Sequence, residues 1–155
     1  NDKPSRKRKH EPHAKNTTGK LNIIFHNLDG LSEERWKKYM ESAVEQFEGA
    51  EADLVLLNET RKDEKYMESL ELSINEDTTQ HWNMHHTNRG KSTGTQTRPG
   101  RGIAMCANVK TLGTTTVVKD MTDDEHNILT IKTNIKDDQE NNIYVMCVVF
   151  VPCQC

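Results

Sequence analysis

Three residues with side chains suited to metal or phosphate chemistry follow two apolar stretches of the chain. Asn27 and Asp29 lie in FHNLDGL, residues 25–31, and Glu59 follows the apolar run of VLLNET, residues 55–60. Mg²⁺ takes oxygen ligands, and proteins commonly hold it through one or two carboxylates together with a substrate phosphate. Asp29 and Glu59 are therefore candidate ligands for Mg²⁺ or Mn²⁺. Asn27 adds no charge and could orient a carboxylate or contact a phosphate oxygen.

The elements that would position these residues are two strands with a helix between them. Residues 20–26 are apolar and β-branched and predict a strand, and residues 53–58 form a short continuous apolar run, typical of a strand covered on both faces. Between them, one apolar stripe with helical spacing predicts a helix over residues 33–48, which Ser32 can cap and Gly49 can close. The stripe consists of Trp36, Tyr39, Met40, Ala43, Val44 and Phe47.

A strand, a helix and a second strand of these lengths predict a right-handed βαβ unit with two parallel strands. The carboxyl ends of parallel strands lie at the same edge of a sheet, which is where ligands bind in open α/β sheets. Asp29 and Glu59 are therefore expected to converge. A plainer alternative stays open, since Asn-x-Asp-Gly after a strand is also ordinary turn chemistry and a Glu after a strand is commonly solvated.

The remainder of the chain adds a weak helical pattern and more strands. Residues 62–75 are charged with a weak helical stripe, and the last strands flank the polar turn KDDQENN, which predicts a hairpin. The final apolar run, IYVMCVVFV, is apolar on both faces, so we expect another element to cover it. The fold class expected is α/β with a mixed sheet. The strand candidates are residues 102–107, 115–119, 127–134 and 142–151.

The charge is unevenly distributed along the 155 residues. The formal net charge is −3, yet residues 1–20 carry seven Lys/Arg against two Asp/Glu, and residues 1–19 read as a disordered basic tail. Residues 86–101 contain four basic residues and no acid, which predicts a mobile loop close to nucleic acid. These four candidate nucleic-acid-binding residues are Arg89, Lys91, Arg98 and Arg101.

Composition also bounds the location of the protein. No apolar run approaches the ~18 residues expected of a membrane span, and the basic, polar start has no signal-peptide character. Cys106 and Cys147 lie in apolar runs, as free cysteines of a reducing compartment do. We therefore expect an intracellular protein without membrane association. SRKRKH in the tail is a candidate nuclear-import signal or, equally, part of a solubilising segment.

The two motifs resemble the opening of the endonuclease/exonuclease/phosphatase superfamily, which includes exonuclease III, the apurinic/apyrimidinic endonucleases, DNase I and the endonucleases of non-LTR retrotransposons. LNIIFHNLDGL is similar to its Trp-Asn-x-(Asn/Asp)-Gly-Leu motif, with His26 in place of Trp, and ADLVLLNETR to its Gln-Glu-Thr motif, with Asn58 in place of Gln. RPGRGIAMCANV and NIYVMCVVFVP are looser matches. The LLNET segment with its basic loop looks most like the retrotransposon branch.

The resemblance implies a fold and a set of roles. Asn27 would match the active-site Asn, Asp29 and Glu59 the acidic metal ligands, and Phe150 the usual active-site Tyr without its hydroxyl. The family fold is a four-layer α/β sandwich of two similar halves, and residues 20–155 would form only the first half. The Asp-x-Asn and Ser-Asp-His motifs of the second half do not occur in this sequence. A second chain or missing segment would have to supply them.

Three functions are compatible with these features. The first is the N-terminal half of an Mg²⁺-dependent endonuclease, acting on nucleic acid, with DNA favoured over RNA, and inactive as this chain alone. The second is a degenerate nuclease-like module with a structural or binding role in a larger (ribonucleoprotein) assembly. The third is another phosphoesterase of the same fold, such as a deadenylase or lipid phosphatase, against which NLDGL speaks.

Overall fold

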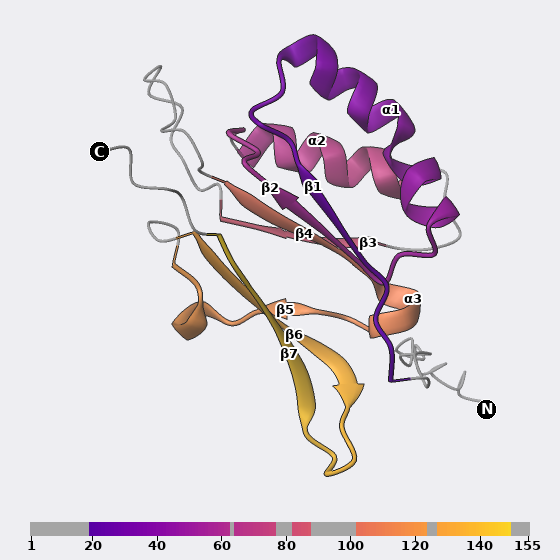
Figure 1. Cartoon of the computed structure of the whole chain (residues 1–155), viewed down its shortest axis with the longest axis vertical. Helices are drawn as coiled ribbons and strands as arrows, with labels where there is room; N and C mark the ends of the chain where they lie inside the picture. The colour runs from indigo at the N-terminus through magenta and orange to yellow at the C-terminus, as the bar shows by residue number, and fades with distance from the viewer. Residues whose placement is uncertain (1–18, 63, 77–81, 88–101, 124–126, 150–155) are drawn as a thin grey trace, which may run out of the picture.

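The computed structural model describes residues 19–62, 64–76, 82–87, 102–123 and 127–149. In this part of the chain the elements form three layers, a pair of helices, a four-stranded sheet and a three-stranded sheet (Figure 1). Most of the predicted basic tail, the four basic residues of the 86–101 loop and Phe150 lie outside the described residues.

The four-stranded sheet begins with the βαβ unit predicted from the sequence. Strand β1 (Ile23–Asn27) leads into α1 (Glu33–Gly49) and then β2 (Leu54–Asn58), and β1 and β2 pair in parallel from Ile23↔Leu54 to Asn27↔Asn58. The Ser32 hydroxyl accepts from the N–H of Arg35, which confirms the predicted cap. Gly49, predicted from the sequence to close the helix, is instead its last helical residue, and Ala50 is the C-cap.

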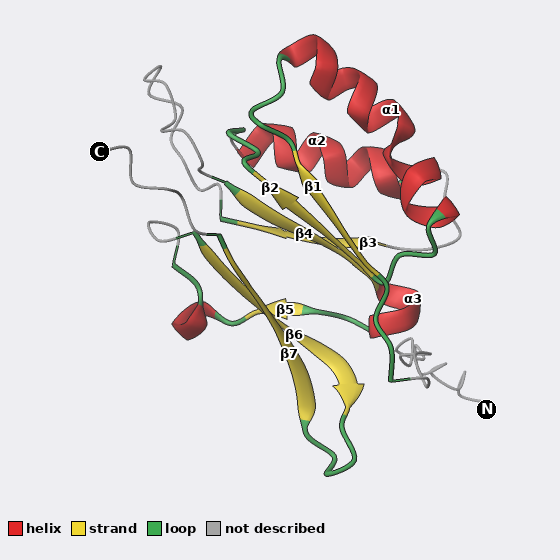
Figure 2. Cartoon of the chain, in the orientation of Figure 1, coloured by secondary structure: helices red, strands yellow, loops and turns green. Residues whose placement is uncertain are grey.

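The second half of this sheet is antiparallel, which makes the sheet mixed. Helix α2 (Glu64–Asn75) leads to β3 (Trp82–His86), and β4 (Ile103–Asn108) then inserts between β2 and β3, antiparallel to both. The strand order is β1-β2-β4-β3. Helices α1 and α2 lie on one side of the sheet and the three-stranded sheet on the other (Figure 2).

Strict alternation along β2 explains why the run Leu54–Asn58 is apolar throughout. Val55 and Leu57 join the core beneath the helices, whereas Leu54 and Leu56 join the core between the two sheets. Trp36 and Phe47 of α1 complete the first core. A strand with one face in solvent carries polar residues on that face. A strand covered on both faces, such as β2, carries apolar residues on both.

The second sheet contains β5 (Thr116–Val117), β6 (Ile128–Lys136) and β7 (Asn142–Val148), in that order. Strands β6 and β7 form the predicted antiparallel hairpin. The strand predicted over residues 115–119 is shorter than expected. After a short helix, α3 (Val109–Leu112), and β5, the chain turns into a 3₁₀ segment, η1 (Lys119–Met121). Thr130 donates its hydroxyl to the carbonyl of Met121, which holds this segment across the sheet.

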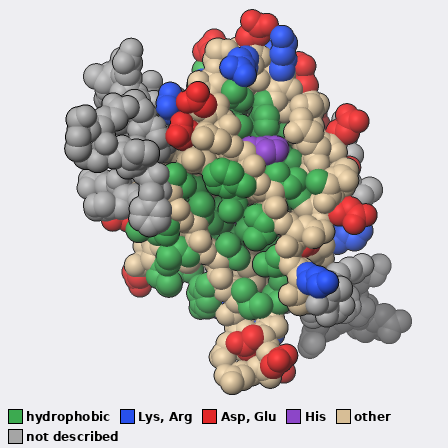
Figure 3. All heavy atoms as spheres, viewed as in Figure 1, with side chains coloured by type: hydrophobic (Ala, Val, Ile, Leu, Met, Phe, Trp, Pro, Cys, Tyr) green, Lys and Arg blue, Asp and Glu red, His purple; other side chains and the backbone are tan. Residues whose placement is uncertain are grey.

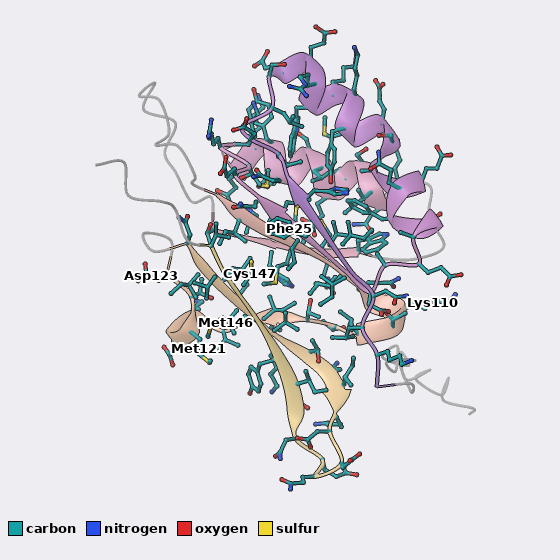
Figure 4. All side chains as sticks on the ribbon, viewed as in Figure 1. Phe25, Lys110, Met121, Asp123, Met146 and Cys147 are labelled. Atoms are coloured by element: carbon teal, nitrogen blue, oxygen red, sulfur yellow. The ribbon has the colours of Figure 1, made fainter. Side chains whose placement is uncertain are left out.

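The two faces of β7 have different surroundings. Cys147 lies on the side that faces the four-stranded sheet and is 8% exposed, whereas Met146 lies on the opposite side and is 49% exposed (Figure 4). Tyr144 and Val148 share the exposed side with Met146. The sequence predicts that another element covers this run, which is apolar on both faces. In the described residues one face of β7 is covered by the four-stranded sheet, and the other face is exposed.

Edge strand β1 presents a second open apolar surface. Ile23 and Phe25 pair with Leu54 and Leu56 and so point toward the inter-sheet core, yet they are 49% and 55% exposed. The described three-stranded sheet ends at β7 and does not cover them. Hydrophobic side chains accordingly gather across the middle of the face seen in Figure 3, with acidic and basic side chains at its margins.

Candidate functional site

The candidate residues lie at the carboxyl ends of β1 and β2, where the register places Asn27 beside Asn58. Two backbone hydrogen bonds join the loops that follow, from the Leu28 N–H to the Asn58 carbonyl at 3.0 Å and from the Gly30 N–H to the Glu59 carbonyl at 2.8 Å. The loop carrying Asp29 is thus tied to the loop carrying Glu59. The predicted proximity of the two acidic residues follows directly from the parallel pairing.

The carboxylates of Asp29 and Glu59 converge on a single atom. Arg61 Nη2 lies 3.3 Å from Asp29 Oδ1 and 3.2 Å from Glu59 Oε2. The Asp29 side chain is 82% exposed, whereas those of Glu59 and Arg61 are 24% and 28% exposed. The predicted pair therefore exists as a geometric unit, with a protein cation between its members.

Three residues of these loops have left-handed backbone conformations. The φ angles of Asp29, Glu59 and Arg61 are 46°, 50° and 47°. Such conformations are uncommon for residues other than glycine, cost on the order of 1 kcal/mol or more each, and cluster at functional sites. Three more non-glycine residues in the described part of the chain share this conformation, Glu51, Asn127 and Glu140, so these loops account for half of such residues.

Asn27 supports the loop that carries Asp29. Its Oδ1 accepts a hydrogen bond from the Asp29 N–H at 3.1 Å, closing a turn. Asn58 acts similarly on the second loop, where its Oδ1 lies 2.8 Å from the Glu59 N–H. The side chain of Asn27 thus forms the kind of turn that was the plainer alternative from the sequence. This turn and the convergence of the two carboxylates are both present in the structure.

Arg61 is the residue that sequence reasoning missed. The available signal was its position two residues after Glu59. That signal is weak, because a basic residue that follows a strand is commonly solvated. Gly30 makes room for it, since a Cβ built on Gly30 would lie 2.6 Å from Arg61 Cδ. The Arg61 Nε is buried, and no acceptor within the described residues bonds it.

The described residues that flank the predicted basic loop lie at this edge of the sheet. The Thr60 N–H donates to the Gly102 carbonyl at 3.2 Å, and the Thr87 N–H donates to the Ile103 carbonyl at 3.0 Å. Thr87 and Gly102 are the described residues on either side of the segment that contains Arg89, Lys91, Arg98 and Arg101. Those four residues and Phe150 lie outside the described part of the chain.

The histidine in place of the superfamily Trp packs near this edge. His26 Nδ1 lies 3.0 Å from the Tyr39 hydroxyl, and burial lowers the pKa of His26 and raises that of Tyr39. The pair joins β1 to α1. His26 therefore serves packing in this chain.

The donor set fits a divalent cation only in part. Two carboxylates that meet at one point are a common protein contribution to an Mg²⁺ site, whose other positions are filled by water and substrate phosphate. Within the described residues no group of three or more His, Cys, Asp or Glu side chains is placed to hold a metal. Asp29 and Glu59 could thus hold one ion only with oxygen ligands from elsewhere.

Neither a protein-family model nor a curated protein matches the sequence. Among solved structures, an endonuclease/exonuclease/phosphatase family protein from Leptotrichia buccalis C-1013-b matches with a TM-score of 0.56 and 15% identity, over 87% of this chain and 56% of that one. A humanized D. rerio TDP2 matches with a TM-score of 0.48 and 15% identity, over 81% and 48%. The chain thus spans about half the length of both.

The first of these matches shows that the chain shares the fold of that protein over about half of that protein's length. The mixed sheet with its βαβ start is the arrangement expected for half of the four-layer sandwich. In the described residues three layers are present, the helices α1 and α2, the four-stranded sheet and the three-stranded sheet, and one side of β7 is exposed. None of the helices in this part of the chain has the length and apolar character needed to cross a membrane.

Proposed function

We propose that the chain is the N-terminal half of a metal-dependent phosphodiesterase acting on nucleic acid, which a second half completes. The observation that carries the proposal is the convergence of the Asp29 and Glu59 carboxylates on one point at the carboxyl ends of β1 and β2. Mg²⁺ or Mn²⁺ would be held there by both carboxylates. When bound, it would supply charge stabilisation at the phosphate.

The residues of this chain have defined parts in that activity. Glu59 and Asp29 would hold the ion, and Asn27 would keep the Asp29 loop in its turn. The basic residues of the 88–101 segment would attract the phosphate backbone, because the segment leaves the sheet at Thr87 and returns at Gly102 beside the acidic loops. A water-activating base is the part that the second half would contribute.

Two open apolar surfaces support the need for a second half. Ile23 and Phe25 extend the inter-sheet core past the edge of β1, and Met146 and Tyr144 lie on the bare side of β7. A polypeptide that adds strands beside β7 would cover the first, and a helix layer over the same sheet would cover the second. Large exposed apolar patches of this kind mark interaction sites.

A structural role is the second candidate, and one observation favours it. Arg61 neutralises both carboxylates without any metal, so the acidic pair is satisfied as a structural ion-pair network. The chain would then be a nuclease-like module within a larger assembly. DNA as substrate, membership of the retrotransposon branch and a nuclear location remain predictions that come from the motifs and the basic tail.

The experiment is a Mn²⁺ titration by calorimetry of the chain purified with every chain that accompanies it, followed by cleavage of supercoiled DNA. We expect Glu59→Gln to abolish the metal binding and the cleavage, and Glu45→Gln, on an exposed position of α1, to change neither. Metal binding that is unaffected by Glu59→Gln would overturn the metal site and leave the structural role.

The completing half is identified by the native mass of the same preparation. A partner of about this chain's size that carries the missing acidic and histidine motifs would establish the divided enzyme. Met146→Lys should weaken that association, because it places a charge on the bare side of β7. A chain that occurs alone, or in an assembly without such a partner, would contradict the proposal.

A further inference from the structure

We propose that Arg61 is a resident counter-cation of the acidic pair, which holds the two loops together in the metal-free protein and competes with the divalent ion for Asp29 and Glu59. The inference rests on the metal site proposed above and concerns how that site is occupied. It is a positioning role, because Arg61 acts through the carboxylates. The geometry that supports it is the single Nη2 atom shared by both.

The first support is the position of the charge. A cation that bridged the two carboxylates would occupy the space between Oδ1 of Asp29 and Oε2 of Glu59, and Arg61 Nη2 lies 3.3 Å and 3.2 Å from these atoms. The guanidinium and a divalent ion cannot both sit there. An ion pair of this kind relieves the repulsion between two acids at close range, as a bound metal would.

The second support is that the site is shaped for the arginine. Gly30 lacks the Cβ that would meet the Arg61 side chain at 2.6 Å, and both Gly30 and Arg61 have left-handed backbones, with φ of 58° and 47°. The Gly30 N–H also bonds the Glu59 carbonyl at 2.8 Å. The loops therefore hold Arg61 over the carboxylates by their own backbone geometry.

The third support is that the arginine can leave. Asp29 is the exposed partner of its ion pair with Arg61, since its side chain is 82% exposed. Ion pairs with an exposed partner contribute little free energy. The Nε of Arg61 is buried without an acceptor among the described residues, so its present position leaves one donor unsatisfied. Moving the guanidinium outward would return that donor to water and free both carboxylates.

The test measures Mn²⁺ affinity directly, by electron paramagnetic resonance of free Mn²⁺ in a titration of the full chain with its co-purifying partners. Arg61→Met keeps an unbranched stem against Gly30 and removes the charge. Arg61 pairs with both carboxylates, so its loss removes two partly exposed ion pairs that oppose the metal, and we expect the dissociation constant to fall by about tenfold.

Two matched variants control this experiment. Arg61→Lys keeps a positive charge and should leave the affinity within about threefold of wild type, since the ammonium still competes. Arg35→Met removes the same charge from an exposed position in the first turn of α1 and should have no effect. An unchanged or weaker affinity in Arg61→Met would overturn the competition and mean that Arg61 supports the metal or the loop instead.

A second measurement keeps the inference testable if Arg61→Met does not fold. In the wild-type protein, Mg²⁺ added at saturating concentration should shift the Arg61 Nε–H resonance toward that of a solvated arginine, while the Arg35 resonance stays in place. An Arg61 resonance that does not move as the metal saturates would contradict displacement. Metal binding that persists in Glu59→Gln would instead refute the proposed metal site, so the two failures are distinguishable.

Discussion

The backbone N–H of Gly30 donates a 2.8 Å hydrogen bond to the carbonyl oxygen of Glu59, and this bond couples the two acidic loops. Gly30 lies in the loop after β1 and Glu59 directly follows β2, so the two residues are 29 positions apart in the sequence. The bond holds because β1 and β2 pair in parallel up to their last residues. The proximity of Asp29 and Glu59 is therefore a property of the backbone, and Arg61 adds to it.

Gly30→Ala tests how far the acidic loops depend on this geometry. A Cβ would force Arg61 to shift and would place a non-glycine residue at φ of 58°, so we expect a loss of about 1–2 kcal/mol in the free energy of unfolding. Gly49→Ala is the matched control, because it lies in α1 with no atom within 4 Å of a built Cβ. It should stabilise by about 0.5–1 kcal/mol. Urea unfolding of both variants measures the difference.

A pair of methionine substitutions tests the open side of β7. Met105 is fully buried between the sheets, so Met105→Ala should cost about 2–5 kcal/mol. Met146 is 49% exposed, so Met146→Ala should cost less than about 1 kcal/mol in the isolated chain. Thermal or urea unfolding gives both values. Equal costs would mean that Met146 is covered in solution, either by a partner or by a second copy of the chain.

The stability of the chain should fall in mild acid through His85. Burial, with a smaller contribution from the charge of His86, lowers the pKa of His85 below its ordinary 6.5. The unfolded chain therefore takes up the proton first, so this contribution to stability is complete above about pH 6.5 and is lost as the pH falls toward the folded-state pKa. Urea unfolding at about pH 7.5 and about pH 5.5 should show the decrease.

His85→Gln identifies the source of that pH dependence. His85 Nε2 lies 2.7 Å from the Thr115 hydroxyl, and glutamine retains a polar group at this position without titrating. The variant should show a smaller difference between the two pH values, with part remaining because burial also lowers the pKa of His26. An unchanged difference would show that another group is responsible.

The two described cysteines should react at different rates with an alkylating reagent. Cys106 is fully buried in β4, where burial raises its pKa most, and the charge of Glu71 raises it further. Cys147 is 8% exposed, and burial also raises its pKa. Because the thiolate is the reactive form, native protein treated with iodoacetamide near neutral pH should leave Cys106 unmodified and label Cys147 slowly. Peptide mapping by mass spectrometry measures both, and rapid labelling of Cys106 would contradict its burial.

The sequence by itself determined the βαβ opening of this protein and the approximate place of its acidic residues. The apolar stripe of α1 and the continuous apolar run of β2 have different periodicities, and these local patterns define the elements within a few residues. The position of Asp29 and Glu59 at one sheet edge then follows from the handedness and parallel pairing of a crossover. Such features depend on short-range chain geometry.

Only the tertiary structure decided what surrounds the acidic pair and which surfaces stay open. The placement of Arg61 between the carboxylates depends on a left-handed turn and on the missing Cβ of Gly30, which periodicity does not encode. The short β5 likewise reflects tertiary structure, because its pairing with β6 stops at Val117 and the chain then turns into η1. The exposure of Phe25 and Met146 depends on which strands lie beside β1 and β7, because burial is decided by contacts between segments far apart in the chain.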